Sequence, residues 1–197
     1  MRYDLFEYPC FKYQIPNWEI SVKQTILNRI NLSKFEKDSL GNFETDRKYS
    51  DYTEYIQDII LPELNLFCLE AQLSCHMTDA WTARYSAGDT QSVHNHCSYG
   101  FSGIIYLEYD SSIHSPTCFI APWQDPKTDK TILRFPDVTE GSIIIFPSYT
   151  LHYVQPNRSD KCRTILSFDL KPDETRHQSK HYGGIENEQK GKIKTPS

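Results

Sequence analysis

Apolar residues in the first third of the chain recur with helical spacing. Such a run extends over residues 18–32, and a second extends over residues 52–73, where Pro62 interrupts it. The residues between them, 33–50, are polar and charged and indicate a loop. We therefore expect helical segments over about 17–73.

The pattern changes after Cys75, where short β-branched and aromatic runs are separated by turn residues. Each run is typical of a short strand. The runs are AWTARYS, SGIIYLEYD, SPTCFIAP, GSIIIFPS, LHYVQP and CRTILSFDLK, with an earlier strand, FKYQI, ahead of the first helix. This order indicates an α+β fold in which helices pad one face of a β-sandwich or barrel. We expect a single domain over 1–174 with its β core at about 75–171, and a flexible polar tail at 175–197.

Composition narrows the classes of function. The 197 residues are 13% aromatic, which is enough bulk to build a core. The net charge of −5 disfavours binding of nucleic acid by bulk charge. The six cysteines contain no CxxC pair, and the N-terminus lacks an apolar leader, so we expect reduced thiols in a cytoplasmic protein. An apolar run of membrane-spanning length does not occur in the sequence.

Three histidines are candidates for a metal site. His94 and His96 form an H-x-H, and residues i and i+2 of a strand point to the same face, so both imidazoles can converge on one ion. His152 lies within the strand–turn–strand stretch GSIIIFPSYTLHYVQP. The alternative interpretation is three unrelated polar side chains on the strands of a sheet.

Arg163 is a candidate anion-binding residue. It lies in a run of Thr, Ile, Leu, Ser and Phe, where an arginine is costly to bury without an anionic partner. Its guanidinium can bind a carboxylate through a bidentate pair of hydrogen bonds. The same strand offers few carboxylates, with Asp169 near its end, so the alternative is a structural ion pair with an Asp or Glu elsewhere in the fold.

Several motifs follow one another in a characteristic order. RYSAGDTQSVHNH precedes SGIIYL, and EGSIIIFPSYTLHYVQP precedes RTILSF. From about residue 79 to residue 170 the sequence resembles the Fe(II)- and 2-oxoglutarate-dependent oxygenases, especially the prolyl-4-hydroxylase-like branch. It is similar above all to a group of small oxygenases of phages and marine bacteria that share the H-x-H.

The resemblance implies a fold, a set of cofactors and a metal site. The fold is a double-stranded β-helix, a jelly roll flanked here by the N-terminal helices, and the cofactors are Fe(II), 2-oxoglutarate and O2. His94 matches the first iron ligand and His152 the distal one. His96 stands in the middle position, where most members carry Asp or Glu. Three imidazoles make such a site one charge unit more positive than two His and one carboxylate. Asp89 is a conceivable replacement, ranked below His96 because it lies outside the motif.

The resemblance also implies a cosubstrate site. Arg163 matches the residue that pairs with the far carboxylate of 2-oxoglutarate, and Tyr106 matches a tyrosine that binds the same carboxylate. Tyr85 matches a pocket tyrosine. Ser167 lies four residues after Arg163 on the same strand face and is placed to touch the cosubstrate. Further residues expected at the pocket mouth are Trp81, Gln91 and Ser102.

The expected activity is hydroxylation of an unactivated C–H bond in a small molecule or peptide, with a peptidyl proline as one candidate. A free amino acid, a modified base and a small metabolite are others. One alternative is a cupin-type dioxygenase with three His and no 2-oxoglutarate, which the H-x-H favours. The other is a non-enzymatic jelly-roll binding module, in which the histidines are unrelated.

Overall fold

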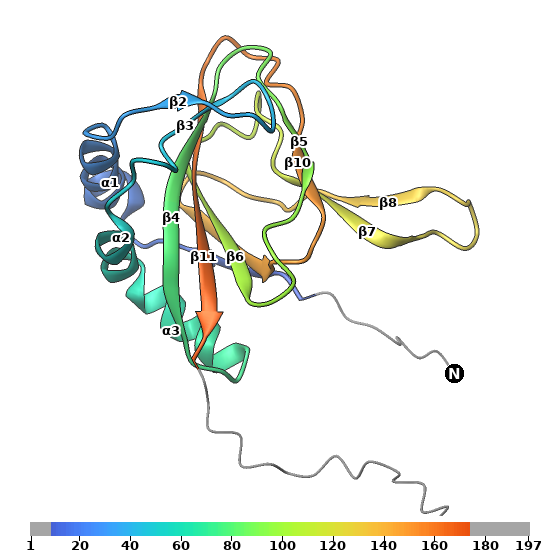
Figure 1. The fold of residues 1–197 in the computed structure, drawn as a ribbon, viewed down its shortest axis with the longest axis horizontal. Helices are drawn as coiled ribbons and strands as arrows, with labels where there is room; N and C mark the ends of the chain where they lie inside the picture. The colour runs from blue at the N-terminus through green and yellow to red at the C-terminus, as the bar shows by residue number, and fades with distance from the viewer. Residues whose placement is uncertain (1–8, 174–197) are drawn as a thin grey trace, which may run out of the picture.

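The computed structural model describes residues 9–173, which form a β-sheet protein with helices on one side (Figure 1). The predicted tail at 175–197 lies outside the described residues. The helical elements all precede the long strands; they are the π-helical turn η1 (Trp18–Val22) and the helices α1 (Lys23–Ile30), α2 (Thr53–Ile59) and α3 (Leu61–Glu70). Among the described residues, the helices are too short or too polar to cross a bilayer.

The break in the second helical run falls at Ile60, just before Pro62. Proline is tolerated in the first turn of a helix because the amide that it lacks has no intrahelical partner there. Pro62 therefore lies in the first turn of α3, which begins at Leu61, and the two helices meet at the shared cap residue Ile60.

Two sheets face each other. The larger sheet has the strand order β1 (Phe11–Gln14), β9 (Ser142–Pro147), β6 (Phe101–Glu108), β11 (Arg163–Pro172), β4 (Cys75–Tyr85), β3 (Glu44–Thr45) and β2 (Glu36–Lys37). The smaller sheet has the order β5 (Gln91–His94), β10 (His152–Val154), β7 (Cys118–Gln124) and β8 (Thr131–Arg134). All of the pairings described between these strands are antiparallel.

Alternate residues of the large sheet build two separate cores. Ile105 and Leu166 pack with buried residues of the helices, such as Ile56. Ile104 and Ile165, their neighbours along the chain, face the interior between the two sheets. The period of two in a strand therefore sends every second side chain toward the helices and the others toward the small sheet. In β11, Ile165 faces the interior between the sheets. Arg163, Ser167 and Asp169 lie at alternate positions from it and are therefore on the same face of the strand.

The structure departs from the sequence prediction in three places. The expected loop at 33–50 contains the short strands β2 and β3, which extend the large sheet beside β4. The strand β8 was missed; it pairs with β7 in a hairpin that projects from the body of the molecule (Figure 1). The strand β5 ends at His94, so the argument from strand alternation does not hold for His96, which lies in the following loop.

Candidate metal centre

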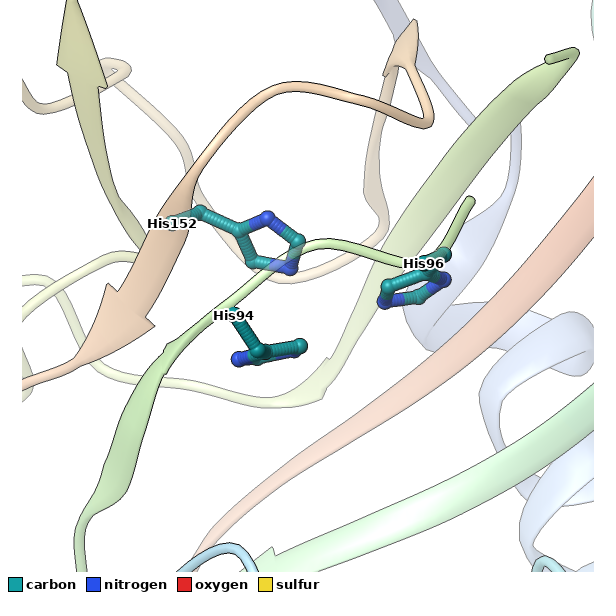
Figure 2. Close-up of side chains that lie close together, drawn as sticks. All are labelled: His94, His96 and His152. Carbon is teal, nitrogen blue, oxygen red and sulfur yellow. The ribbon is translucent and has the colours of Figure 1, made fainter. Parts of the chain in front are cut away.

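The three candidate histidines converge in the structure. His94 is the last residue of β5, and it lies directly opposite His152, the first residue of β10, in the antiparallel pair. His96 reaches the same space from the loop after β5, where its backbone amide donates to the Ser148 carbonyl at 3.0 Å. Ligand atoms of the three side chains all lie within 4.8 Å of one another. Figure 2 shows the three rings gathered around one common space.

Each imidazole is oriented by an acceptor on its Nδ1. Nδ1 of His94 lies 2.8 Å from the Ser92 carbonyl, and Nδ1 of His152 lies 2.9 Å from the Thr150 carbonyl. Nδ1 of His96 lies 2.7 Å from Oδ1 of Asp169. Carbonyl and carboxylate oxygens only accept, so in each neutral ring Nδ1 carries the proton and Nε2 keeps its lone pair. This arrangement is typical of metal-binding histidines.

Burial keeps two of these rings neutral. Desolvation, with repulsion from His94 next, lowers the pKa of His152 to about 3. Desolvation likewise lowers the pKa of His94. A metal ion requires an unprotonated imidazole, and neutral imidazole suits Fe, Zn, Cu and Ni. The donor set therefore fits a first-row transition metal.

Arg163 is buried without an ionic partner among the described residues. The residue is 2% exposed, and the described residues include no ion pair to it. Its Nη2 donates to Oγ1 of Thr117 at 3.2 Å, whereas Nε and Nη1 have no hydrogen-bond partner among the described residues. The guanidinium carbon lies 5.2 Å from the ring centre of Tyr85 and 5.8 Å from that of Tyr106. Two unused donors on a buried cation form a receptor for a carboxylate.

One small cavity borders His94 and His152 and extends to Thr117, which contacts Arg163. Its walls come from both sheets; they are Trp81, Ala83, Gln91, His94, Ile104, Thr117, His152, Val154, Ile165 and Ser167. Thr117 touches both the cavity and Arg163, so it links the two. Sequence reasoning missed Thr117, because a threonine just before a strand carries no chemical signal of its own.

The two candidate tyrosines are held as neutral phenols. Burial raises the pKa of both Tyr85 and Tyr106. The Tyr85 hydroxyl donates to Oε1 of Gln91 at 2.7 Å, and the Gln91 amide nitrogen lies 3.4 Å from Nε2 of His94. The Tyr106 hydroxyl accepts from the Thr117 amide at 3.2 Å. Both tyrosines therefore lie beside Arg163 and are hydrogen-bonded to residues of the cavity wall.

Asp89 does not join the histidine cluster. Its Oδ2 accepts from the Ser86 amide at 2.8 Å, which closes the turn at Gly88, and it lies 3.8 Å from Lys37. The three histidines form the described cluster of possible metal ligands without it. The structure thus favours His96 over Asp89 for the middle position.

The structure adds Asp169, which the sequence analysis noted only as a carboxylate near the end of the strand of Arg163. It accepts from His96 and, on the same Oδ1 atom, from the Ser102 hydroxyl at 2.7 Å. Burial by itself would raise the pKa of Asp169, but the hydrogen bonds from His96 and Ser102 outweigh it and lower the pKa below its usual value. Asp169 is therefore an anion beside the cluster.

Comparison with known proteins agrees with this site. Residues 79–169 match the family described as "Putative 2OG-Fe(II) oxygenase". The matched segment carries all three histidines, Arg163 and both tyrosines. This match confirms the predicted relationship to the Fe(II)- and 2-oxoglutarate-dependent oxygenases and, with it, the predicted enzyme class and cofactors. A search of curated proteins found no match to the chain.

Solved structures share the fold. A 2OG-Fe(II) oxygenase family oxidoreductase from Burkholderia pseudomallei is 13% identical, with a TM-score of 0.61 over 82% of this chain and 85% of that one. A prolyl-4-hydroxylase from Pseudomonas putida is 12% identical, with a TM-score of 0.55 over 83% and 93%. HygX from Streptomyces hygroscopicus, solved with nickel, 2-oxoglutarate and hygromycin B, is 9% identical, with a TM-score of 0.58 over 85% and 84%. At these identities the likeness is one of fold.

Proposed function

From the match of residues 79–169 to the 2OG-Fe(II) oxygenase family, we propose that this protein is an Fe(II)- and 2-oxoglutarate-dependent dioxygenase that hydroxylates an unactivated C–H bond. The observation that carries the proposal is a converged histidine cluster beside a cavity that extends to Thr117, the hydrogen-bond partner of a buried arginine with two unused donors. These are the two halves of a site for a metal and a dicarboxylate.

His94, His96 and His152 are the proposed metal ligands, each through Nε2. When bound, Fe(II) would activate dioxygen, and 2-oxoglutarate would supply the remaining electrons as it is converted to succinate and carbon dioxide. The protein orients the ligands through the acceptors on Nδ1. The apolar walls of the cavity, which include Ile104 and Ile165, exclude bulk water from the same space.

Arg163 is the proposed anchor for the far carboxylate of 2-oxoglutarate. Its Nε and Nη1 would donate to the two carboxylate oxygens, which satisfies the donors that have no partner in the described structure. The rings of Tyr85 and Tyr106 lie beside the guanidinium, and both residues supply neutral hydroxyls. Ser167 lines the same cavity as His94, His152 and Thr117, where it would contact the cosubstrate.

The strand arrangement supports a double-stranded β-helix. From β4 to β11 the chain passes back and forth between the sheets, so that β4, β6, β9 and β11 pair in one sheet and β5, β7, β8 and β10 in the other. We propose that residues 1–174 form one such domain. The six cysteines are free thiols, which supports the cytoplasm as the compartment.

An apolar hollow supports a substrate with an apolar part near the reacting carbon. It has a volume of about 470 Å³ and lies between the hairpin β7–β8 and the segment at Pro9. Two of its walls, Phe119 and Phe146, have ring centres 5.8 and 5.1 Å from that of His152. A small molecule or a peptide fits this description, and a peptidyl proline remains one candidate.

The convergence of three histidines also favours the second candidate, a cupin-type dioxygenase that uses no 2-oxoglutarate. In that case Arg163 would have no dicarboxylate to bind. The two candidates therefore differ in a single measurable property, which is binding of 2-oxoglutarate to the metal-loaded protein.

The test is an anaerobic titration of the Fe(II)-loaded protein with 2-oxoglutarate. We expect a visible metal-to-ligand charge-transfer band that saturates. Arg163→Met should weaken 2-oxoglutarate binding by about 2–5 kcal/mol, thirtyfold or more, while Fe(II) binding stays stoichiometric. Arg158→Met is the matched control, because Arg158 is exposed on the loop before β11.

The other outcomes identify the rival functions. Stoichiometric Fe(II) binding without the band would favour the three-histidine dioxygenase. Absence of stoichiometric Fe(II), unchanged in His152→Ala, would favour a binding module.

A further inference from the structure

One of the three histidines differs from the others in its partner. His94 and His152 each direct Nδ1 to a backbone carbonyl of the residue two positions earlier, which is a neutral and local acceptor. His96 instead directs Nδ1 to the carboxylate of Asp169, a residue 73 positions away in the sequence, at 2.7 Å. The side chains are mostly buried, at 8% exposed for His96 and 19% for Asp169. A buried charge at such a contact requires a physical reason.

The sheet places Asp169 with little freedom. The residue lies in β11, the strand between β4 and β6, where it pairs with Asp79 on one side and with Ser102 on the other. It shares the inward parity of Ile165, so its side chain is directed between the sheets. The pairing with β4 shifts register immediately after Asp169. Such irregularities are common beside functional sites, where they redirect a side chain.

A small hydrogen-bonded unit holds the carboxylate and His96 together. The Ser102 hydroxyl lies 2.7 Å from Oδ1 of Asp169 and 2.9 Å from the hydroxyl of Ser148. Ser148 in turn accepts the backbone amide of His96 through its carbonyl. The ring and the backbone of His96 are therefore fixed by the same unit.

The charged neighbour on the solvent side is Arg47. One of its guanidinium nitrogens lies 4.0 Å from Oδ2 of Asp169, and its Nε lies 3.6 Å from Asp79. The guanidinium carbon also lies 4.0 Å above the ring of Trp81, which itself lies 5.4 Å from the ring of His96. Arg47 is half exposed and at the limit of an ion pair, so it leaves the negative charge of Asp169 directed mainly at His96.

We propose that Asp169 is a positioning residue of the metal centre, which holds His96 with Nε2 toward the metal and supplies, one hydrogen bond away, the negative charge that His96 itself lacks. This inference rests on the proposed function. Three neutral imidazoles around a divalent ion leave the site one unit more positive than two imidazoles and a carboxylate. An anionic acceptor on one imidazole offsets that extra positive charge and raises the basicity of the imidazole as a ligand.

A purely structural role would predict a different set of effects. If Asp169 served only to hold β11 against β6, its removal would lower stability and leave metal binding to the folded protein unchanged. The proposed role predicts that metal affinity changes in folded variants, and that hydrogen bonding and charge contribute separately.

The experiment compares three variants by anaerobic Fe(II) titration of the full chain. Asp169→Leu removes both acceptor and charge, and we expect its Fe(II) dissociation constant to rise about 10–100-fold. Asp169→Asn keeps an acceptor for His96 and removes the charge, so we expect a smaller rise. Asp79→Asn is the matched control, because it removes the same charge from the paired position of β4 without touching a histidine, and we expect no change.

Two spectroscopic measurements distinguish positioning from packing. In ¹⁵N NMR of the metal-free protein, His96 should keep its proton on Nδ1 in the wild type and in Asp169→Asn, and lose that preference in Asp169→Leu. In the Fe(II)–2-oxoglutarate complex, loss of the charge should make the iron harder to oxidise. The charge-transfer band of Asp169→Asn should therefore move to shorter wavelength, and that of Asp79→Asn should not.

The outcomes separate this inference from the function on which it rests. Wild-type protein that binds no Fe(II) would overturn the proposed function itself. Fe(II) binding by folded Asp169→Leu with wild-type affinity would overturn the role of Asp169 alone. If Asp169→Leu does not fold, wild-type affinity and an unshifted band in Asp169→Asn would overturn the contribution of charge.

Discussion

At the scale of single residues, the acceptors beside the functional side chains decide what those side chains can do. An imidazole has two nitrogens, and the oxygen on Nδ1 determines that Nε2 faces the cluster. A guanidinium has five N–H groups, and Arg163 uses one nitrogen on Thr117 while Nε and Nη1 have no partner among the described residues. The protein itself supplies the acceptor on Nδ1 of each histidine, whereas Arg163 has two donors that a ligand can use.

The pKa of His152 predicts how the metal-free protein responds to acid. Its folded pKa is about 3, whereas an unfolded histidine titrates near 6.5. Between these values the unfolded chain takes up a proton that the folded protein does not. The stability from this residue is therefore complete above pH 6.5 and declines as the pH falls toward 3.

His152→Gln removes this titration. In EDTA, the difference in unfolding free energy between wild type and His152→Gln should change by about 1.4 kcal/mol per pH unit through that window. Urea unfolding at a series of pH values measures it. Parallel stability curves for the two proteins would contradict the buried, neutral state of His152.

At the scale of elements, the close pairing of β6 and β11 brings the inward residues of β11 to the site. Gly103 of β6 lies opposite Phe168 of β11, on the face toward the helices. A Cβ on Gly103 would overlap the ring of Phe168. The absence of a side chain at residue 103 thus lets a large ring lie across the strand while Ser167 and Asp169 keep their places on the other face.

Gly103→Ala should destabilise the protein by about 1–3 kcal/mol through overpacking. Urea unfolding measures the effect. In a Phe168→Leu background the cost should shrink, because the smaller side chain leaves room for the methyl group. Fe(II) stoichiometry should be unchanged in the folded variant, since the contact is on the helix side of the sheet. Equal costs in both backgrounds would show that the ring is not the obstacle.

At the scale of the whole molecule, the helices cover one face of the large sheet and the small sheet covers the other (Figure 1). The candidate site lies between the sheets, so its residues come from β4, β6 and β11 of the large sheet, from β5 and β10 of the small one, and from the segments just after β5 and just before β7. The strand β11 lies inside the large sheet, between β6 and β4. Just after its end, the Asp173 amide donates to the Ser74 carbonyl and the Asp173 side chain contacts His76, which fixes the end of the strand.

A chain ended at residue 174 should therefore keep the melting temperature and Fe(II) stoichiometry of the full chain, as measured by calorimetry and metal analysis. A chain ended at residue 162 lacks β11, which lies between β4 and β6, and should not fold. A lower melting temperature for the longer fragment would show that residues beyond 174 pack on the domain.

Local patterns predicted much of this architecture. Helical spacing located the helices before residue 73, and β-branched and aromatic runs bounded by turn residues located most long strands of the core, because both signals depend on neighbours along the chain. The same patterns missed β2, β3 and β8, which are short and exist through pairing with β4 and β7. Pairing partners distant in sequence leave little trace in a short polar segment.

The sequence by itself determined the chemistry that this protein can offer, which is imidazoles in an H-x-H with a distal partner and an arginine in an apolar strand. Only the tertiary structure decided the partners: Asp169 beside His96, and Thr117 beside the guanidinium of Arg163. The physical reason is that residue type and spacing are properties of the chain, whereas a hydrogen bond between residues 73 or 46 positions apart depends on strand register and packing.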